Sequence, residues 1–309
     1  MSPDEQSRTI TFTEPVDLAL TIAPLRRGRY DPATQLGAAG LWRATRTPEG
    51  PSTLAVVGRD GASRTHSAVF EARAWGPGAE WALEHAPALL GARDHPEEFR
   101  TDHPLIARLV RRLPGLRVSR ANAVFETLIP TVLEQKVTGF ESRRAYRQLV
   151  AKLGEPAPGP AGLTLPPDPG AIAGTPYYEL HLLGVERNRA DTLRRVASQA
   201  HRLESLLALS STEAQRELTQ IRGIGPWSAG EVAFIAFGDP DAVSIGDYHV
   251  PHQVAWALAG EERATDERML ELLEPFRGHR GRVIRLITAA RLGPERKGPR
   301  MGPNDFRER

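Results

Sequence analysis

The sequence predicts an α+β protein, in which an antiparallel sheet domain with one helix over residues 1–98 precedes an all-helical domain over residues 99–293. In the first segment, short runs of alternating apolar and polar residues are separated by turn residues, as is typical of strands. In the second segment, apolar residues recur at helical spacing. With 309 residues, 40% of them hydrophobic, the chain is long enough to build two cores.

The first domain is expected to contain four strands and then a helix, over residues 9–13, 16–22, 53–57, 68–72 and 79–90. Turn signals such as Glu49-Gly50-Pro51 and Arg59-Asp60-Gly61 separate these runs. In the second domain, a helix over residues 124–133 precedes one that begins at a capping box of Thr138 and Glu141 and ends near Gly154. Residues 155–174 are rich in Pro and Gly, which predicts a long loop.

Composition excludes several classes of protein. The chain has no cysteine, so disulfides and a four-cysteine iron–sulfur cluster are excluded. It has no run of 18 apolar residues, and its first residues lack a basic region followed by an apolar one, so a cytoplasmic protein without a membrane segment is expected. Residues 294–309 are expected to form a basic flexible tail.

Positive charge is concentrated after residue 98. The net charge is only +2, but residues 1–98 hold more acidic than basic residues, so the remainder carries the positive balance. Three of the 40 basic residues are lysines and the rest are arginines. Arginine makes bidentate contacts with phosphate, which favours nucleic-acid binding. A GC-rich genome would produce the same excess of arginine.

A glycine turn between two helices is the most informative local feature. A helix that starts at a capping box of Ser210 and Glu213 continues until Gly223 and Gly225 interrupt it, and Pro226 suits the first position of a second helix. The two glycines let the turn approach a phosphate closely, and the second helix offers free N–H groups at its N-terminus. The pattern predicts a helix-hairpin-helix grip on DNA; an ordinary corner between two helices is the alternative.

The hairpin and a downstream carboxylate resemble a known family. The segments Gly223-Ile224-Gly225-Pro226-Trp227-Ser228-Ala229 and Asp247-Tyr248 are similar to the helix-hairpin-helix (HhH-GPD) DNA glycosylase superfamily, and within it to the bacterial 3-methyladenine DNA glycosylase II type. Further segments match in order: Phe125-Glu126-Thr127-Leu128-Ile129, Leu133-Glu134-Gln135-Lys136-Val137-Thr138, and Leu183-Gly184-Val185 with Arg189-Ala190 and Leu193. The resemblance implies an N-terminal α/β domain and a helical HhH-GPD domain. It also implies a monomer that binds double-stranded DNA containing a damaged base.

Asp247 falls where the family has its catalytic carboxylate. Cleaving a base from deoxyribose develops positive charge on the sugar, and a carboxylate beside the sugar stabilises it by roughly 3 to 4 kcal/mol on mutational precedents. A second carboxyl, acting as an acid, is not needed when the departing base is already cationic, as an N-alkylated purine is. The alternative role is a helix N-cap before residues 250–258, and the two roles are compatible.

Trp227 occupies the position at which bifunctional members carry a lysine that forms a Schiff base with the sugar. An indole cannot do so, and the resemblance therefore implies a monofunctional enzyme that uses water. Trp227, Glu231 and Tyr248 are the expected base pocket. Trp227 could stack on a flipped base, or lie in the core. Glu231, one turn further along, could accept a hydrogen bond from the amino group of a base or favour a cationic base; a solvated or salt-bridged glutamate is the alternative.

The residues expected to bind DNA are Gln135, Lys136, Gly223, Gly225, Ser228 and His279. Two of them depart from the family pattern. Lys136 stands where the family presents an apolar or amide wedge, and His279 stands near an aromatic position. The sequence therefore identifies neither the wedge nor the lesion.

No cofactor is expected to be required, and in particular no iron–sulfur cluster. The resemblance implies a Na⁺ or K⁺ ion held by the backbone carbonyls of Thr219, Ile221 and Gly223. His249 and His252 lie one turn apart, but without a third ligand in view they are more simply a surface or core pair.

The predicted function is that of a monofunctional DNA glycosylase in base excision repair. It would flip out damaged purines, of the alkylated 3-methyladenine type, and hydrolyse their N-glycosidic bond, acting in the cytoplasm at the nucleoid. The alternative is a non-catalytic protein that binds damaged or unusual DNA structures through the same hairpin. Asp247 distinguishes the two, because a pure binder needs no carboxylate at the sugar.

Overall fold

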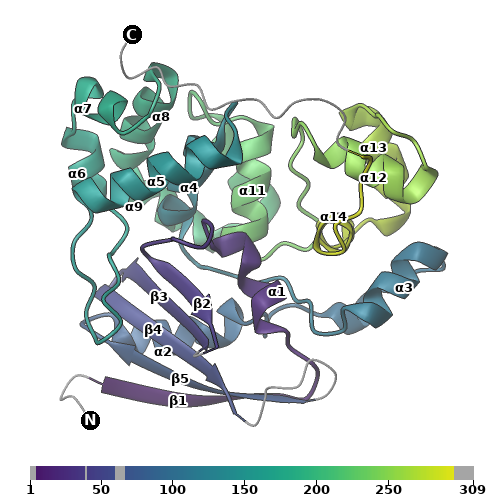
Figure 1. The fold of residues 1–309 in the computed structure, drawn as a ribbon, viewed down its shortest axis with the longest axis horizontal. Coiled ribbons are helices and arrows are strands. Elements are labelled where there is room, and N and C mark those ends of the chain that lie inside the picture. Colours follow the sequence, from purple (N-terminus) through teal and green to yellow (C-terminus); the bar gives the residue numbers. More distant parts are fainter. Residues whose placement is uncertain (1–4, 39, 60–66, 296–309) are drawn as a thin grey trace.

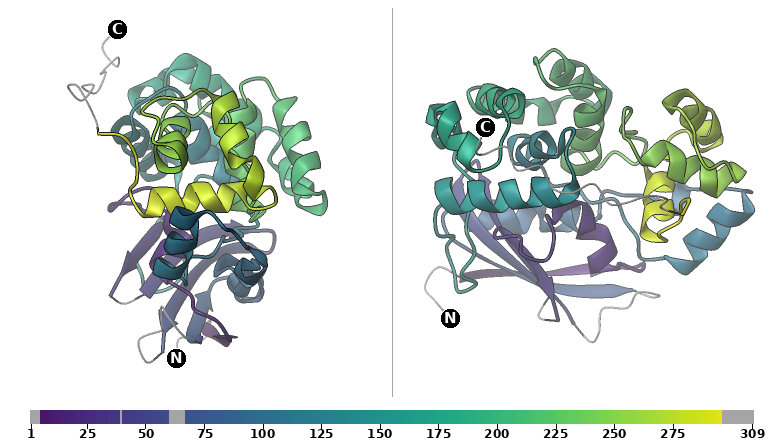
Figure 2. Two further views of the ribbon diagram at one scale, coloured as in Figure 1. Left: turned by 90° about the vertical axis from the view of Figure 1, so that its right-hand side faces the viewer. Right: turned by 45° about the horizontal axis from the view of Figure 1, so that its top comes forward.

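The computed structural model describes residues 5–38, 40–59 and 67–295. A sheet lies on one side of the molecule and most of the helices on the other (Figures 1 and 2). The five strands form one antiparallel sheet in the order β1-β5-β4-β3-β2. Their bounds are β1 (Glu5–Phe12), β2 (Thr34–Gly37), β3 (Gly40–Thr47), β4 (Gly50–Gly58) and β5 (Ala68–Trp75). Helix α2 (Ala79–Leu89) packs on β1, β4 and β5, so the predicted α+β class is confirmed.

One predicted strand is wrong. Residues 16–22 form helix α1 (Leu18–Ile22) instead, because the Asp17 carboxylate accepts a hydrogen bond from the Leu20 backbone N–H at 3.1 Å and so caps a helical turn. The alternating hydrophobicity of this short run does not reveal that cap. The other three predicted runs fall in β1, β4 and β5, and the predicted helix is α2.

Twelve further helices follow α2 among the described residues. They are α3 (Pro104–Arg112), α4 (Val124–Glu134), α5 (Gly139–Leu153), α6 (Pro169–Gly174), α7 (Tyr177–Leu182), α8 (Arg187–Ala197), α9 (Ala200–Ser205), α10 (Ser211–Thr219), α11 (Pro226–Ala236), α12 (Val250–Ala259), α13 (Asp266–Leu273) and α14 (Arg280–Ala289). The two predicted capping boxes are present at the starts of α5 and α10.

The long loop predicted over residues 155–174 ends early. Helix α6 begins at Pro169, and the Asp168 carboxylate accepts a hydrogen bond from the Gly170 N–H at 2.8 Å. Asp followed by Pro is a helix start signal that the high Pro and Gly content of the segment obscured.

The helices pack around two hydrophobic clusters. Helices α4 to α11 share a cluster that includes Leu128, Leu193 and Val232. A second cluster, which includes Val254 and Leu286, joins α3 to α12, α13 and α14. Residues 237–249 connect the two bundles, and Asp247 lies in this connection. The sheet and α2 have their own cluster, and a domain boundary near residue 98 stays a prediction.

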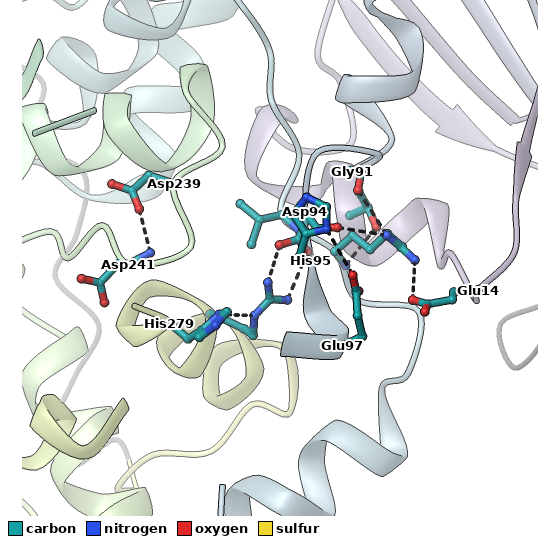
Figure 3. Close-up of polar contacts among 12 residues, drawn as sticks. Glu14, Gly91, Asp94, His95, Glu97, Asp239, Asp241 and His279 are labelled. Carbon is teal, nitrogen blue, oxygen red and sulfur yellow. Dashed lines mark hydrogen bonds and ion pairs between the residues drawn. The ribbon is translucent and has the colours of Figure 1, made fainter. Parts of the chain in front are cut away.

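A buried ion pair joins the segment after α2 to the last helix. The Asp94 carboxylate accepts hydrogen bonds from both terminal nitrogens of Arg282 (Figure 3). It also accepts one from the Val118 N–H at 2.9 Å. The two side chains are 0% and 3% exposed. Beside them, Arg117 donates to the backbone oxygen of Asp94 and to the carboxylate of Glu14. The network therefore fixes α14 against the sheet side of the molecule.

Two further expectations concern the C-terminal tail and membrane-spanning helices. Most of the predicted basic tail, residues 296–309, lies outside the described residues. Among the described helices, none combines the length and the apolar character that a membrane span requires.

Candidate active site at the helical hairpin

Helices α10 and α11 form the predicted hairpin, and its two glycines have different roles. Gly223 has a φ of +96°, and a Cβ there would lie 2.2 Å from the Thr192 hydroxyl on α8, so the fold itself requires glycine. Gly225 has an extended backbone, with φ −100° and ψ −177°, at the N-cap of α11. A Cβ at Gly225 would meet no described atom within 4 Å. Gly225 therefore lies on the open side of the turn, where another molecule can approach.

Gln135 ties the hairpin to the end of α4. Its side-chain amide donates to the Gly223 carbonyl oxygen and to the Ser228 hydroxyl, both at 2.9 Å. Ser228 is only 2% exposed. The Ser228 hydroxyl is buried against Gln135 and does not face solvent, and DNA binding by Ser228 stays a prediction. Gln135 itself is engaged with the protein and positions the hairpin.

The same contacts bear on the predicted cation site. The Gly223 carbonyl accepts from Gln135, and the Ile221 carbonyl accepts from the Ile224 N–H at 2.9 Å. Two of the three implied ligands thus accept one hydrogen bond each, which leaves a second lone pair on each oxygen, and binding of a Na⁺ or K⁺ ion stays a prediction. The described residues contain no group of three or more His, Cys, Asp or Glu side chains that could hold a metal.

The Asp247 carboxylate is hydrogen-bonded at the start of α12, as the capping role requires, and its catalytic role stays a prediction. One carboxylate oxygen accepts hydrogen bonds from the backbone N–H groups of His249, at 2.7 Å, and Val250, at 2.9 Å, at the start of α12. The other oxygen accepts a hydrogen bond from Trp227 Nε1 at 3.0 Å. Three N–H donors therefore hold a half-buried carboxylate in one orientation beside the hairpin. Its connection to Trp227 joins the two helical bundles at this point.

Trp227 is half-buried, so it is not a core tryptophan. It follows Pro226 in the first turn of α11, which places its ring next to the Gly223 to Gly225 turn. The indole therefore lies between the hairpin and the carboxylate of Asp247.

Glu231 lies one turn after Trp227 on α11 and accepts a hydrogen bond from the Ser244 hydroxyl. Burial raises the pKa of its carboxyl; the Ser244 hydrogen bond opposes this, and the negative charges of Glu134 and Asp247 add to it. The arginine Arg27 acts in the opposite direction. No described cation forms an ion pair with Glu231, so it is not the salt-bridged glutamate considered as the alternative.

Three further predicted site residues differ in their exposure and position. Tyr248 is 77% exposed and packs edge-on against His249, so it does not line a closed base pocket. Lys136 is exposed, with a φ of +55°, in the turn after α4. His279 is half-buried at the start of α14 (Figure 3).

The structure does not support His279 as a DNA contact. Its ring accepts a hydrogen bond from Arg282 Nε at 3.2 Å and lies 5.0 Å from the ring of Phe99. Burial, and then the charge of Arg282, lowers its pKa. His252 is likewise used internally, because its Nδ1 accepts from the Ala264 N–H, which agrees with a simple surface pair rather than a metal site.

Three residues near Glu231 were missed in the sequence. Ser244, Glu134 and Arg27 lie in separate segments, and Arg27 comes from the N-terminal domain. Nothing in the local pattern distinguishes Arg27 from its neighbours Arg26 and Arg29. Of the three, Glu134 is the one that the sequence could have identified, because it stands directly before Gln135 in the segment that resembles the glycosylases.

Comparisons with known proteins agree with this geometry. No protein-family model matches the chain. An alignment 187 residues long, which covers 56% of this chain and 59% of the other protein, is 27% identical to a DNA-3-methyladenine glycosylase of Bacillus subtilis (strain 168). A 148-residue stretch, 47% of this chain, is 30% identical to a probable bifunctional transcriptional activator/DNA repair enzyme AlkA of Mycobacterium tuberculosis (strain CDC 1551 / Oshkosh) and covers 29% of it. The chain thus matches less than two thirds of the length of these relatives.

Solved structures extend the likeness to nearly the whole chain. A 3-methyladenine DNA glycosylase from Archaeoglobus fulgidus aligns with a TM-score of 0.75 and 19% identity, over 92% of this chain and 98% of that one. An 8-oxoguanine glycosylase/lyase from Clostridium acetobutylicum aligns with a TM-score of 0.68 and 15% identity, over 93% and 97% of the two chains. The chain therefore has the same fold as these DNA glycosylases. Within that class the sequence resembles the 3-methyladenine glycosylases, as the motifs predicted.

Proposed function

We propose that this protein is a DNA glycosylase of base excision repair that hydrolyses the N-glycosidic bond of alkylated purines without cutting the strand. One observation carries the proposal: the Asp247 carboxylate is held beside the hairpin by Trp227 and by two backbone N–H groups. A protein that only binds DNA would not need a carboxylate oriented in this place. The relatives and structural neighbours named as glycosylases support the same class.

The chemistry needs little from the protein beyond this carboxylate. The bond between C1′ and the base nitrogen breaks, and its electron pair leaves with the base. Water adds to C1′ and loses a proton, and Asp247 stabilises the positive charge that develops on the sugar. A purine that already carries an alkyl group and a positive charge leaves without a further acid.

The absence of a lysine at position 227 supports a water-dependent reaction. An amine nucleophile would form a covalent Schiff base and lead to strand cutting. The 8-oxoguanine glycosylase/lyase among the structural neighbours shows that the fold accommodates both reactions. Lys136 is exposed and directly follows Gln135, whose side chain contacts the hairpin, so it is the lysine to test as a nucleophile.

The test measures single-turnover base release from a duplex that contains 3-methyladenine or 7-methylguanine. Replacing Asp247 with Asn should slow release by about 10²–10³-fold, as loss of one electrostatic group does in other enzymes. Asp168→Asn is the matched control, because Asp168 also caps a helix but lies at α6. Borohydride should trap no covalent adduct with DNA.

Each outcome has a clear meaning. If the wild type binds damaged DNA but releases no base from any of a panel of lesions, the protein is a binder and the proposal fails. A trapped adduct would refute the water mechanism, and loss of that adduct in Lys136→Ala would identify the nucleophile.

A further inference from the structure

Three charged side chains from distant segments meet next to Trp227 and Asp247. Glu134 is the last residue of α4, and its carboxylate lies 3.3 Å from a terminal nitrogen of Arg27 in the N-terminal domain. Glu231 comes from α11. Gln135, the residue after Glu134, donates to the Ser228 hydroxyl on α11, and Glu231 lies three residues further along that helix. Because α4 packs on α11, the Arg27–Glu134 pair lies at the end of α4 beside this part of α11, and its charges act on Glu231.

The loop that carries Arg27 is held firmly. The Asp31 carboxylate accepts hydrogen bonds from the backbone N–H groups of Arg27, Ala33 and Thr34, at 2.6, 2.9 and 3.0 Å. A Cβ at Gly28 would lie 2.7 Å from the side chain of Arg143 on α5, so the loop packs directly on the helical domain. Arg27 is therefore positioned by the fold and is not a chance surface contact.

Charge in this cluster is unbalanced. Asp247 is bound by three N–H groups and Glu134 is paired with Arg27, whereas among the described residues the hydroxyl of Ser244 is the one hydrogen-bond donor to Glu231. A carboxylate that is partly removed from water without a counterion is unfavourable, and a bound cation beside it relieves that cost. In addition, the Nε–H of Arg27 is buried and has no hydrogen-bond partner among the described residues.

We propose that Glu231 reads the charge of the extruded base, and that the Arg27–Glu134 ion pair sets how much negative potential Glu231 presents to it. This inference rests on the proposed glycosylase function and assigns specificity-determining residues to that site. A purine alkylated on a ring nitrogen carries a positive charge that Glu231 attracts, whereas a neutral lesion gains nothing from it. Arg27, although it belongs to the N-terminal domain, weakens that attraction.

The proposal predicts changes of opposite sign. The quantity measured is the ratio of single-turnover release rates for a cationic base, 7-methylguanine, and a neutral one, hypoxanthine, in the same duplex. Glu231→Gln should lower this ratio about tenfold, because one charge of interaction is lost. Glu134→Gln should lower it as well, since it leaves the positive charge of Arg27 uncompensated. Arg27→Gln should raise it.

The control is Glu204→Gln. Glu204 is also a buried carboxyl whose pKa is raised by burial, but it accepts hydrogen bonds from the Val124 and Phe125 N–H groups at the start of α4, away from Asp247. Its substitution should leave the ratio within about twofold of the wild type. A loss of folding would lower both rates together, so the ratio separates specificity from stability, and Glu231→Asp should keep the preference because it keeps the charge.

The two proposals fail in different ways. If the wild type releases bases but Glu231→Gln and Arg27→Gln shift the ratio in the same direction, or not at all, charge reading by Glu231 is overturned and the glycosylase function stands. If the wild type releases no base, the function fails. Calorimetric binding of free 7-methylguanosine and guanosine then tests charge reading directly, and equal affinity for the two nucleosides would overturn it.

Discussion

At the scale of single residues, Glu231 shows the free-energy cost of placing a carboxyl group in a partly buried site. Its pKa is raised above the usual value of 4.5 chiefly by burial, and Glu134 and Asp247 add to the effect while Ser244 and Arg27 oppose it. A carboxyl with a raised folded-state pKa stabilises the protein fully only below its unfolded pKa. That stability is lost as the pH rises through the folded pKa.

The substitution Glu231→Gln should therefore stabilise the protein at pH 7.5, raising its melting temperature by roughly 2–4 °C. The gain should shrink as the pH falls through the folded-state pKa and below 4.5, because the wild-type carboxyl becomes protonated in both states below its unfolded pKa. Thermal unfolding monitored by circular dichroism across this pH range checks the prediction. An unchanged melting temperature at pH 7.5 would contradict the prediction, because it would mean that burial of the Glu231 carboxylate does not destabilise the folded state.

At the scale of elements, one glycine of the hairpin is required by the fold, and the other, two residues later, lies on the face proposed to bind DNA. Gly223 is required by its positive φ and by the closeness of Thr192 on α8, whereas Gly225 has an ordinary φ and faces open space. The side chain of Gln135 holds the hairpin from the opposite side. The element is thus anchored by α4 and α8 and offers its other face to a partner.

Two alanine substitutions in the hairpin should give opposite results. Gly223→Ala should lower the free energy of unfolding by about 1 kcal/mol or more, because it adds both strain and a clash. Gly225→Ala should cost about 0.5 kcal/mol at the N-cap, yet it should weaken binding to any duplex, since its methyl group separates the turn from the phosphate. Fluorescence anisotropy with undamaged DNA measures the binding. Wild-type affinity in Gly225→Ala would show that DNA contacts another face.

At the scale of the whole molecule, the buried Asp94–Arg282 pair fixes α14 to the segment that follows α2, and so it connects the C-terminal bundle to the sheet side (Figure 3). Asp247 begins α12 of that same bundle, while Trp227 belongs to the other one. The spacing between the carboxylate and the hairpin therefore depends on how the bundles are held together.

Replacing Asp94 with Asn should destabilise the protein by about 3 kcal/mol, because it leaves the charge of Arg282 buried without a partner. Glu14→Gln is the matched control. Glu14 pairs with Arg117 but is 43% exposed, so its loss should cost less than about 1 kcal/mol. Urea unfolding compares the two variants, and equal losses would contradict a special role for the Asp94 pair.

Local signals in the sequence were sufficient for the hairpin, the capping boxes, Asp247 and the α+β class. They also revealed that position 227 holds no lysine and that the chain has no cysteine. Each of these depends on residues a few positions apart, whose spacing alone indicates a turn, a cap or a reactive group. The same local reading failed at residues 16–22, where one capping carboxylate outweighed the alternating pattern.

Only the tertiary structure decided which side chains share the site. It buried the Ser228 hydroxyl, engaged the His279 ring with Arg282, exposed Tyr248, joined Trp227 to Asp247, and paired Arg27 with Glu134. Burial and charge interactions depend on distances between segments that lie up to two hundred residues apart in the chain, and no local pattern encodes those distances. The sequence by itself therefore indicated the proposed class of reaction and the carboxylate proposed for it, and the packing of the sheet and the two helical bundles decided what surrounds that carboxylate.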